Sequence, residues 1–110
     1  MISVCMMTRS GRLCGFTSTG HADYDEKGKD IVCAAVSALT QTCVMGLTEI
    51  VECAADVQCS ERDGIQCLVR PETEPSKGEQ AELLLKTLHA GLVAIREAYP
   101  GTLKIRVREV

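Results

Sequence analysis

Apolar residues recur at every second position at the start of the chain, at Ile2, Val4 and Met6. The stretch 9–12 interrupts this pattern, and a second short extended run follows from Leu13 to about Thr19. A period of two is typical of a half-buried β-strand. The pattern therefore predicts a first β-hairpin.

The spacing of apolar residues changes to three and four between Asp30 and about Cys53, a stretch that contains no proline. This spacing predicts a long amphipathic helix. Its apolar residues are Val32, Ala35, Val36, Leu39, Cys43, Leu47 and Ile50. Asp is a preferred residue at the position that caps a helix N-terminus, so we expect the helix to begin at Asp30.

Alternation returns at 55–60 and 65–69, on either side of Asp63-Gly64, a dipeptide favoured in tight hairpin turns. These features predict a second hairpin. A second helix is expected to start at the capping box Ser76-Lys77-Gly78-Glu79 and to end at Pro100-Gly101. A final half-buried strand follows, in which Leu103, Ile105 and Val107 alternate with basic residues.

The predicted order of elements is ββαββαβ. Two hairpins with short turns favour an α+β fold in two layers, a mainly antiparallel five-stranded sheet with both helices on one face. The length of 110 residues fits a single domain over 1–110. Val44, Met45 and Val51 lie off the main apolar stripe of the first helix, and we therefore expect a homodimer.

Composition limits the classes of partner. Only 3% of residues are aromatic and the net charge is −3, so neither a base-stacking platform nor a strong attraction to phosphate is expected. We expect no direct nucleic-acid binding. The N-terminus lacks the features of a signal peptide and no apolar run approaches about 18 residues, so we expect a cytoplasmic protein with no membrane association.

Cysteine is unusually frequent, with seven residues in the chain. No two of them stand at C-x-x-C spacing, and neither histidine lies near a cysteine pair. Zinc-ribbon, zinc-finger and thioredoxin-type motifs are therefore absent. Most of these thiols are expected to pack as small hydrophobic side chains.

Cys33 differs from the other six because it would fall in the first turn of a helix that starts at Asp30. Unpaired backbone N–H groups and the positive end of the helix dipole stabilise a thiolate there, and the thiolate is the nucleophilic form. His21 precedes it by twelve residues at the end of the second predicted strand, where it could act as the base. It could equally be an exposed loop histidine.

Two further residues fall on the helical stripe of Cys33. Asp30 and Ser37, at spacings of three and four residues from it, are supporting candidates, although Asp30 could only cap the helix and Ser37 only pack. Gly20 and Gly28 bracket a loop dense in charge, and we expect them to act as hinges of a flexible lid.

The segment Gly20-His21-Ala22, followed by Gly28 and then by Asp30 to Ser37 (DIVCAAVS), resembles the signature of the bacterial ribosomal-processing cysteine protease family, Prp. The resemblance implies an endopeptidase that needs no cofactor. Its substrate would be a precursor of the twenty-seventh protein of the large ribosomal subunit, cut after an aromatic residue in an apolar N-terminal extension. His21 and Cys33 take the positions of the family's dyad, and the first-turn N–H groups are the expected oxyanion donors.

Two other functions stay open from the sequence. A noncatalytic ribosome-associated module would bind the precursor without cleaving it. A thiol redox sensor would form a peroxide-dependent disulfide between Cys33 and a neighbouring cysteine.

Overall fold

The computed structural model describes residues 1–20 and 27–110, except for the side chains of 27–30. The described residues form β1 (Ile2–Arg9), β2 (Arg12–Thr19), α1 (Lys27–Met45), β3 (Ala55–Ser60), β4 (Gly64–Val69), α2 (Pro75–Ala98) and β5 (Leu103–Glu109). A π-helical segment, Gly46–Ile50, continues α1. The predicted order ββαββαβ and the α+β class are confirmed.

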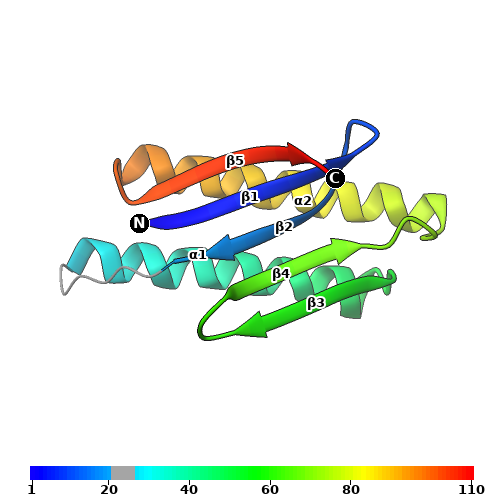
Figure 1. The fold of residues 1–110 in the computed structure, drawn as a ribbon, viewed down its shortest axis with the longest axis horizontal. Coiled ribbons are helices and arrows are strands. Elements are labelled where there is room, and N and C mark those ends of the chain that lie inside the picture. Colours follow the sequence, from blue (N-terminus) through cyan, green and yellow to red (C-terminus); the bar gives the residue numbers. More distant parts are fainter. Residues whose placement is uncertain (21–26) are drawn as a thin grey trace.

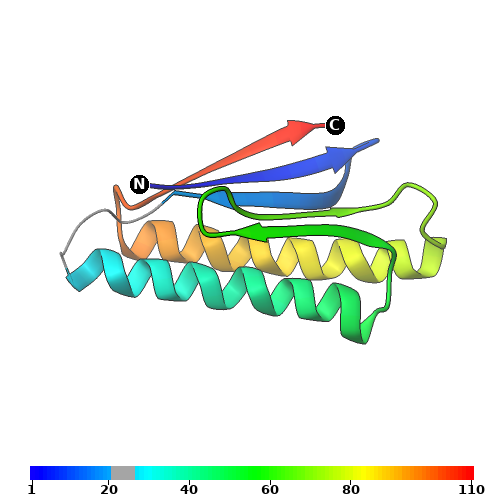
Figure 2. The ribbon, with the colours of Figure 1, turned by 60° about the horizontal axis from the view of Figure 1, so that its bottom comes forward.

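The five strands form one sheet in the order β3-β4-β2-β1-β5 (Figure 1). Every neighbouring pair is antiparallel except β1 and β5, which run parallel. Both helices lie against the same face of the sheet, and the other face is open (Figure 2). The expected two-layer arrangement is therefore confirmed, with one parallel pair in a mainly antiparallel sheet.

The first hairpin turns at Ser10 and Gly11, whose φ angles are 55° and 79°. Two consecutive residues with positive φ fit the type I′ turn that matches the twist of paired strands. The register shifts between Met7 and Thr8, next to this turn. The interruption at 9–12 in the sequence thus marks a two-residue turn.

The core lies between the sheet and the helices and is almost entirely aliphatic. Its fully buried members include Val4, Met6, Phe16, Val32, Leu47, Leu85 and Leu92. Burying a side chain of this size stabilises a fold by about 1.5–3 kcal/mol. These contacts hold α1 and α2 at fixed positions against the sheet.

The capping box predicted for α2 is wrong. The helix begins at Pro75 with Glu74 as its N-cap, and no side chain caps this end by a hydrogen bond. Pro is favoured at the first helical position because its φ is already fixed near the helical value. Ser76 and Glu79 therefore lie within the first turns of α2.

The expectation that no apolar run reaches membrane-spanning length is also wrong. Ile31–Ile50 has a mean hydropathy of 1.7 over 20 residues, enough to cross a bilayer by length and composition. A core helix of a folded protein meets the same criteria, and Val32, Val36 and Leu47 from this segment are buried in the core.

Candidate active site

A cleft of about 380 Å³ opens between the first half of α1, the end of β2 and the β3–β4 hairpin. Cys33 and Ser37 line it from α1, and Ser18 and Gly20 line it from β2 and the residue that follows. The remaining lining residues are Ile2, Val36, Thr40, Gln41, Cys59, Ser60, Glu61, Gly64 and Ile65. Four separate segments of the chain, the start of β1 included, thus meet around one cleft.

Cys33 is held at this cleft by the packing of its neighbours on α1. Val32 and Val36 are buried in the core, which fixes the rotation of the helix about its axis. Cys33 is half-buried, packs against the edge of that core and lines the cleft. Ser37 lies one turn later, is exposed and lines the same cleft, as its helical spacing from Cys33 predicts.

The expected start of α1 at Asp30 is wrong, because the described part of the helix already includes Lys27. Asp30 therefore lies inside the helix and is not its N-cap, and Cys33 lies beyond the first turn. The effect of a helix dipole falls off within the first turn, so the dipole contributes less at Cys33 than a start at Asp30 would imply. The first-turn N–H groups also lie at least about 4 Å away along the helix axis, at 1.5 Å per residue.

The two glycines that were expected to be hinges, Gly20 and Gly28, lie in different structural settings. Gly20 follows β2 and adopts a φ of 99°, and a Cβ at this position would lie 2.6 Å from the Met1 carbonyl oxygen. Only glycine fits this close approach of two backbones. Gly28 lies inside α1, so the expectation that it is a loop hinge is wrong. The expected lid between them covers 21–26, which lie outside the described residues.

His21 also lies outside the described residues. Its chain position nevertheless limits where it can be. It directly follows Gly20, a residue that lines the same cleft as Cys33. The proposed base is thus joined by one peptide bond to the wall of the cleft.

The other cysteines divide by burial. Cys14, Cys43, Cys53 and Cys67 are buried, and burial raises the pKa of each thiol, to about 11 for Cys43 and about 12 for Cys67. Raised pKa values disfavour the nucleophilic thiolate. Cys59 is exposed and shares the cleft with Cys33, and Cys5 is half-buried on another part of the sheet.

The β3–β4 hairpin forms part of the site, although no sequence motif indicated this. Gly64 allows its approach to β2, because a Cβ there would lie 2.0 Å from the Ser18 carbonyl oxygen. The turn is closed by the Asp63 backbone N–H, which donates to Ser60 Oγ at 2.8 Å. The Asp63-Gly64 turn signal located the hairpin but carried no information about which helix it would face.

Among the described residues, no group of three or more His, Cys, Asp or Glu side chains is placed to hold a metal ion. The side chains that line the cleft include two thiols, several hydroxyl groups, the Glu61 carboxylate and the Gln41 amide. A half-buried thiol on a fixed helix is suited to attack a carbonyl group if a base removes its proton.

A family model described as cysteine protease Prp matches residues 1–104. The chain belongs to this family. Two curated Prp proteins, both named ribosomal processing cysteine protease, show the same relationship. The Bacillus subtilis protein is 28% identical over 84% of each chain, and the Staphylococcus aureus protein is 26% identical over 89% of this chain and 90% of its own.

Solved structures share the fold described above. A Streptococcus mutans protein superposes with a TM-score of 0.81 at 31% identity, covering 100% of this chain and 96% of its own. The S. aureus Prp, solved in complex with a substrate peptide, gives a TM-score of 0.81 at 25% identity, with coverages of 97% and 99%. The Prp fold thus extends over the whole chain, and a member of the family binds peptide.

Proposed function

We propose that this Prp protein is a cysteine endopeptidase that removes the N-terminal extension from the precursor of the twenty-seventh protein of the large ribosomal subunit. Cys33 is the nucleophile and His21 is its base. The observation that carries the proposal is the meeting of Cys33 and Gly20, the neighbour of His21, at one cleft of about 380 Å³. Membership of a cysteine protease family supports the class of reaction.

In this mechanism His21 accepts the proton of Cys33, and the thiolate attacks the carbonyl carbon of the scissile peptide bond. The protonated imidazole then donates its proton to the leaving amine, which leaves an acyl-enzyme on Cys33. A water molecule that gives its proton to His21 attacks the thioester carbonyl. The carboxylate product departs and the free thiol is restored.

Ser37 and Asp30 are supporting residues in this proposal. Ser37 is one turn from Cys33 in the same cleft, where its hydroxyl can hydrogen-bond with the substrate or with His21. Asp30 is one turn before Cys33 on α1 and is kept as the second supporting residue. The cell compartment is proposed to be the cytoplasm, where ribosomal proteins are made and where the seven thiols stay reduced.

The test is to mix the purified protein with the host's ribosomal protein precursor and to determine the cleavage site by mass spectrometry. Cys33→Ala and His21→Ala should each lower kcat/KM by about 10³-fold or more, and the double variant should lose little further activity because the two residues act as one unit. Cys59→Ala is the matched control, since it removes the other thiol of the same cleft.

Each outcome separates the possible functions. Cleavage by folded Cys33→Ala at the parent's rate would contradict the proposed nucleophile. Binding of the precursor without cleavage by the parent protein would indicate a noncatalytic module. Loss of activity in Cys59→Ala but not in Cys33→Ala would identify Cys59 on β3 as the nucleophile.

A further inference from the structure

We propose that the free edge of β3 binds the substrate as an added β-strand, which leads an extended apolar peptide into the cleft of Cys33. This inference rests on the proposed function, since it names how that substrate is held. The β3 edge is defined here by Ala55, Val57 and Cys59. The last of these lines the cleft itself.

The hydrogen-bonding pattern of the hairpin shows which backbone groups point outward. The Arg70 N–H donates to the Ala54 carbonyl oxygen at 2.8 Å, so these two residues form a hydrogen-bonded pair. The register from Ala55↔Val69 to Ser60↔Gly64 runs on without a shift. In an antiparallel ladder, hydrogen-bonded pairs alternate with non-hydrogen-bonded ones. The N–H and C=O groups of Ala55, Val57 and Cys59 therefore point away from β4, toward the free edge.

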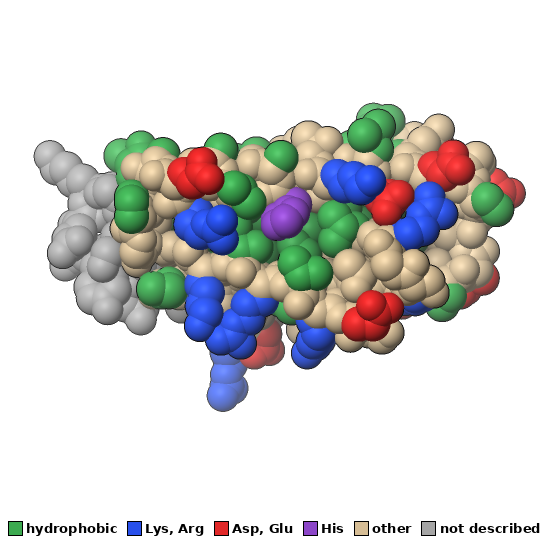
Figure 3. Space-filling model, turned by 90° about the horizontal axis from the view of Figure 1, so that it is seen from above, with side chains coloured by type: hydrophobic (Ala, Val, Ile, Leu, Met, Phe, Trp, Pro, Cys, Tyr) green, Lys and Arg blue, Asp and Glu red, His purple; other side chains and the backbone are tan. Residues whose placement is uncertain are grey.

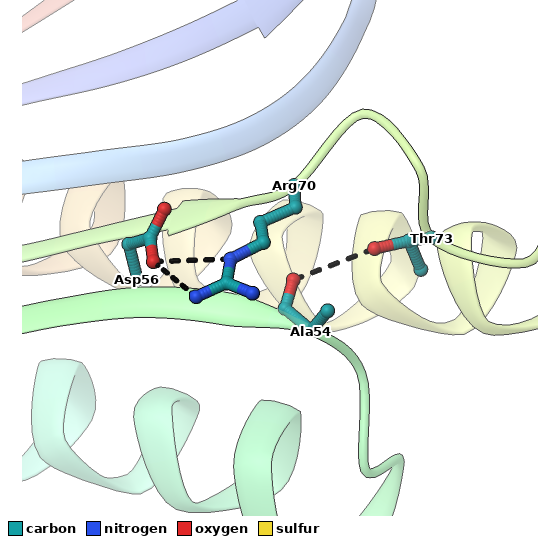
Figure 4. A network of polar contacts seen from close by, with 4 residues as sticks. All are labelled: Ala54, Asp56, Arg70 and Thr73. Atoms are coloured by element: carbon teal, nitrogen blue, oxygen red, sulfur yellow. Dashed lines mark hydrogen bonds and ion pairs between the residues drawn. The ribbon is translucent and has the colours of Figure 1, made fainter.

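This end of the hairpin is held in place by polar contacts. Arg70 donates from Nε and Nη2 to Asp56 Oδ1 at 3.1 and 2.8 Å, and Thr73 donates its hydroxyl to the Ala54 carbonyl oxygen at 3.4 Å (Figure 4). The guanidinium lowers the pKa of the Asp56 carboxyl, which therefore stays ionised at neutral pH. These contacts join the start of β3 to the end of β4 and to the segment that follows it.

The side chains of the same three residues face the helix layer. Cys59 pairs with Ile65, which pairs with the buried Ser18, and residues directly opposite one another in a sheet project to the same face. Val57 likewise lies opposite Cys67, which is 0% exposed, yet Val57 itself is 38% exposed. The helix layer therefore covers β4 and leaves the apolar side of β3 partly open.

The two edges of the sheet differ in charge. At the other edge, β5 carries Lys104, Arg106 and Arg108 at alternate exposed positions, and basic side chains are prominent in Figure 3, which views the molecule from above β5. Charged residues on an edge strand discourage the addition of another strand. On β3 the one charged side chain, Asp56, is paired with Arg70. Strand addition is thus favoured at β3.

An extended apolar peptide fits this edge better than a helix or a folded partner does. Its backbone can pair with the outward N–H and C=O groups, and every second side chain would lie over Val57 and the flank of α1. The edge continues directly into the cleft through Cys59, so a peptide paired with β3 places a carbonyl group near Cys33.

The experiment uses folded Cys33→Ala protein and a synthetic peptide that spans the cleavage junction found with the precursor. Amide hydrogen exchange at Val57 and Cys59 should slow by about tenfold or more when the peptide binds, as expected for a newly formed hydrogen bond of about 1.4 kcal/mol. The amides of Gln58 and Ser60 already bond to β4 and serve as internal controls, so their exchange should change much less.

Two variants test the apolar side of the edge in the active enzyme. Val57→Lys should raise KM for the peptide about tenfold with little change in kcat, because it affects binding and not the reacting groups. Val107→Lys is the matched control, an exposed valine on the opposite edge strand. A peptide series with single backbone N-methyl groups should lose affinity at every second position, the period of a paired strand.

Several outcomes would overturn the inference while leaving the protease intact. Cleavage by the parent protein with unchanged exchange at Val57 and Cys59 in the complex would place the peptide elsewhere. Protection of these amides without peptide, rising with protein concentration, would assign the edge to a second copy of the chain. Failure of the parent protein to cleave the precursor would instead contradict the proposed function.

Discussion

Two thiols share the cleft, and the roles proposed for them rest on different surroundings. Cys33 is half-buried on α1 beside the edge of the core, whereas Cys59 is exposed on an edge strand. The four buried thiols have raised pKa values and are shielded from solvent. Accessibility alone would favour Cys59 as the reactive thiol, so selective reaction at Cys33 would require a specific base.

Limiting iodoacetamide at mildly acidic pH should therefore modify Cys33 ahead of Cys59 and Cys5. The thiolate is the form that iodoacetamide modifies, and a base beside Cys33 would supply the thiolate there. Cys43 and Cys67 should stay unmodified, since their pKa values are about 11 and 12. Peptide mapping by mass spectrometry gives the order.

His21→Ala should remove the advantage of Cys33 at acidic pH but not change the reaction of Cys59. Uniform labelling of Cys33 and Cys59 in the parent protein would mean that the free enzyme does not activate Cys33. The assignment of the dyad to the substrate-free state would then be wrong.

Cys33 was predicted to be reactive because a helix that starts at Asp30 would place it in the first turn. In the structure the helix starts earlier. Asp is favoured both as an N-cap and within the first turn, so the residue type alone could not distinguish a start at Asp30 from an earlier one. Cys33 still lies at a cleft, for a different reason. Its neighbours Val32 and Val36 are core residues, and their spacing turns Cys33 to the side of the helix next to the sheet.

At the level of elements, the β3–β4 hairpin determines the shape of the cleft through its close approach to β2. Gly64 has a φ of 78° and no room for a Cβ beside the Ser18 carbonyl oxygen. Alternating patterns and the turn dipeptide were sufficient to predict the hairpin. The close contact could not be predicted, because it depends on which strand lies beside β4.

Gly64→Ala should lower the free energy of unfolding by about 2–4 kcal/mol, since it combines a strained φ with a steric clash. Gly11→Ala is the matched control, because Gly11 has a φ of 79° but open space around its Cα. It should lose only about 1 kcal/mol from backbone strain. Urea denaturation of both variants gives the comparison. Equal losses would mean that β2 shifts to accept the added methyl group.

For the whole molecule, the sequence predicted the number and order of elements but not the order of strands in the sheet. Alternation of apolar and polar residues shows that a segment is a strand, but it does not show which strands pair with it. The parallel pairing of β1 with β5 joins segments about a hundred residues apart, and no local signal reports such a contact. The cleft could not be predicted for the same reason, since it joins four segments that are separated in the sequence.

We still propose the homodimer that was expected from the first helix, but with different residues at the interface. Val44 and Val51 are half-buried against the core, so they are poor candidates for an interface. Ile31, Met45 and Ile50 are 55%, 48% and 80% exposed on α1 and its π-helical continuation. Exposed apolar side chains of this size commonly mark a site of association.

Sedimentation equilibrium should therefore show a dimer for the parent protein. The double variant Ile31→Lys and Met45→Lys should weaken association by at least about tenfold, because charged side chains would have to lose water at the interface. Leu83→Lys, at an exposed apolar position of α2, serves as the control for added charge. A parent protein that sediments as a monomer at all concentrations would contradict the proposal.

The parallel pairing of β1 with β5 also bears on when the enzyme becomes active after synthesis. Ile2 lines the cleft and pairs with Leu103, which is synthesised about a hundred residues later. Closing so long a loop has an entropy cost that is offset only when the sheet is complete. Until β5 has been synthesised, β1 lacks one of its two neighbouring strands. We therefore expect nascent chains that end before β5 to lack a finished cleft. Proteolysis would then begin only after β5 has been synthesised and has paired with β1.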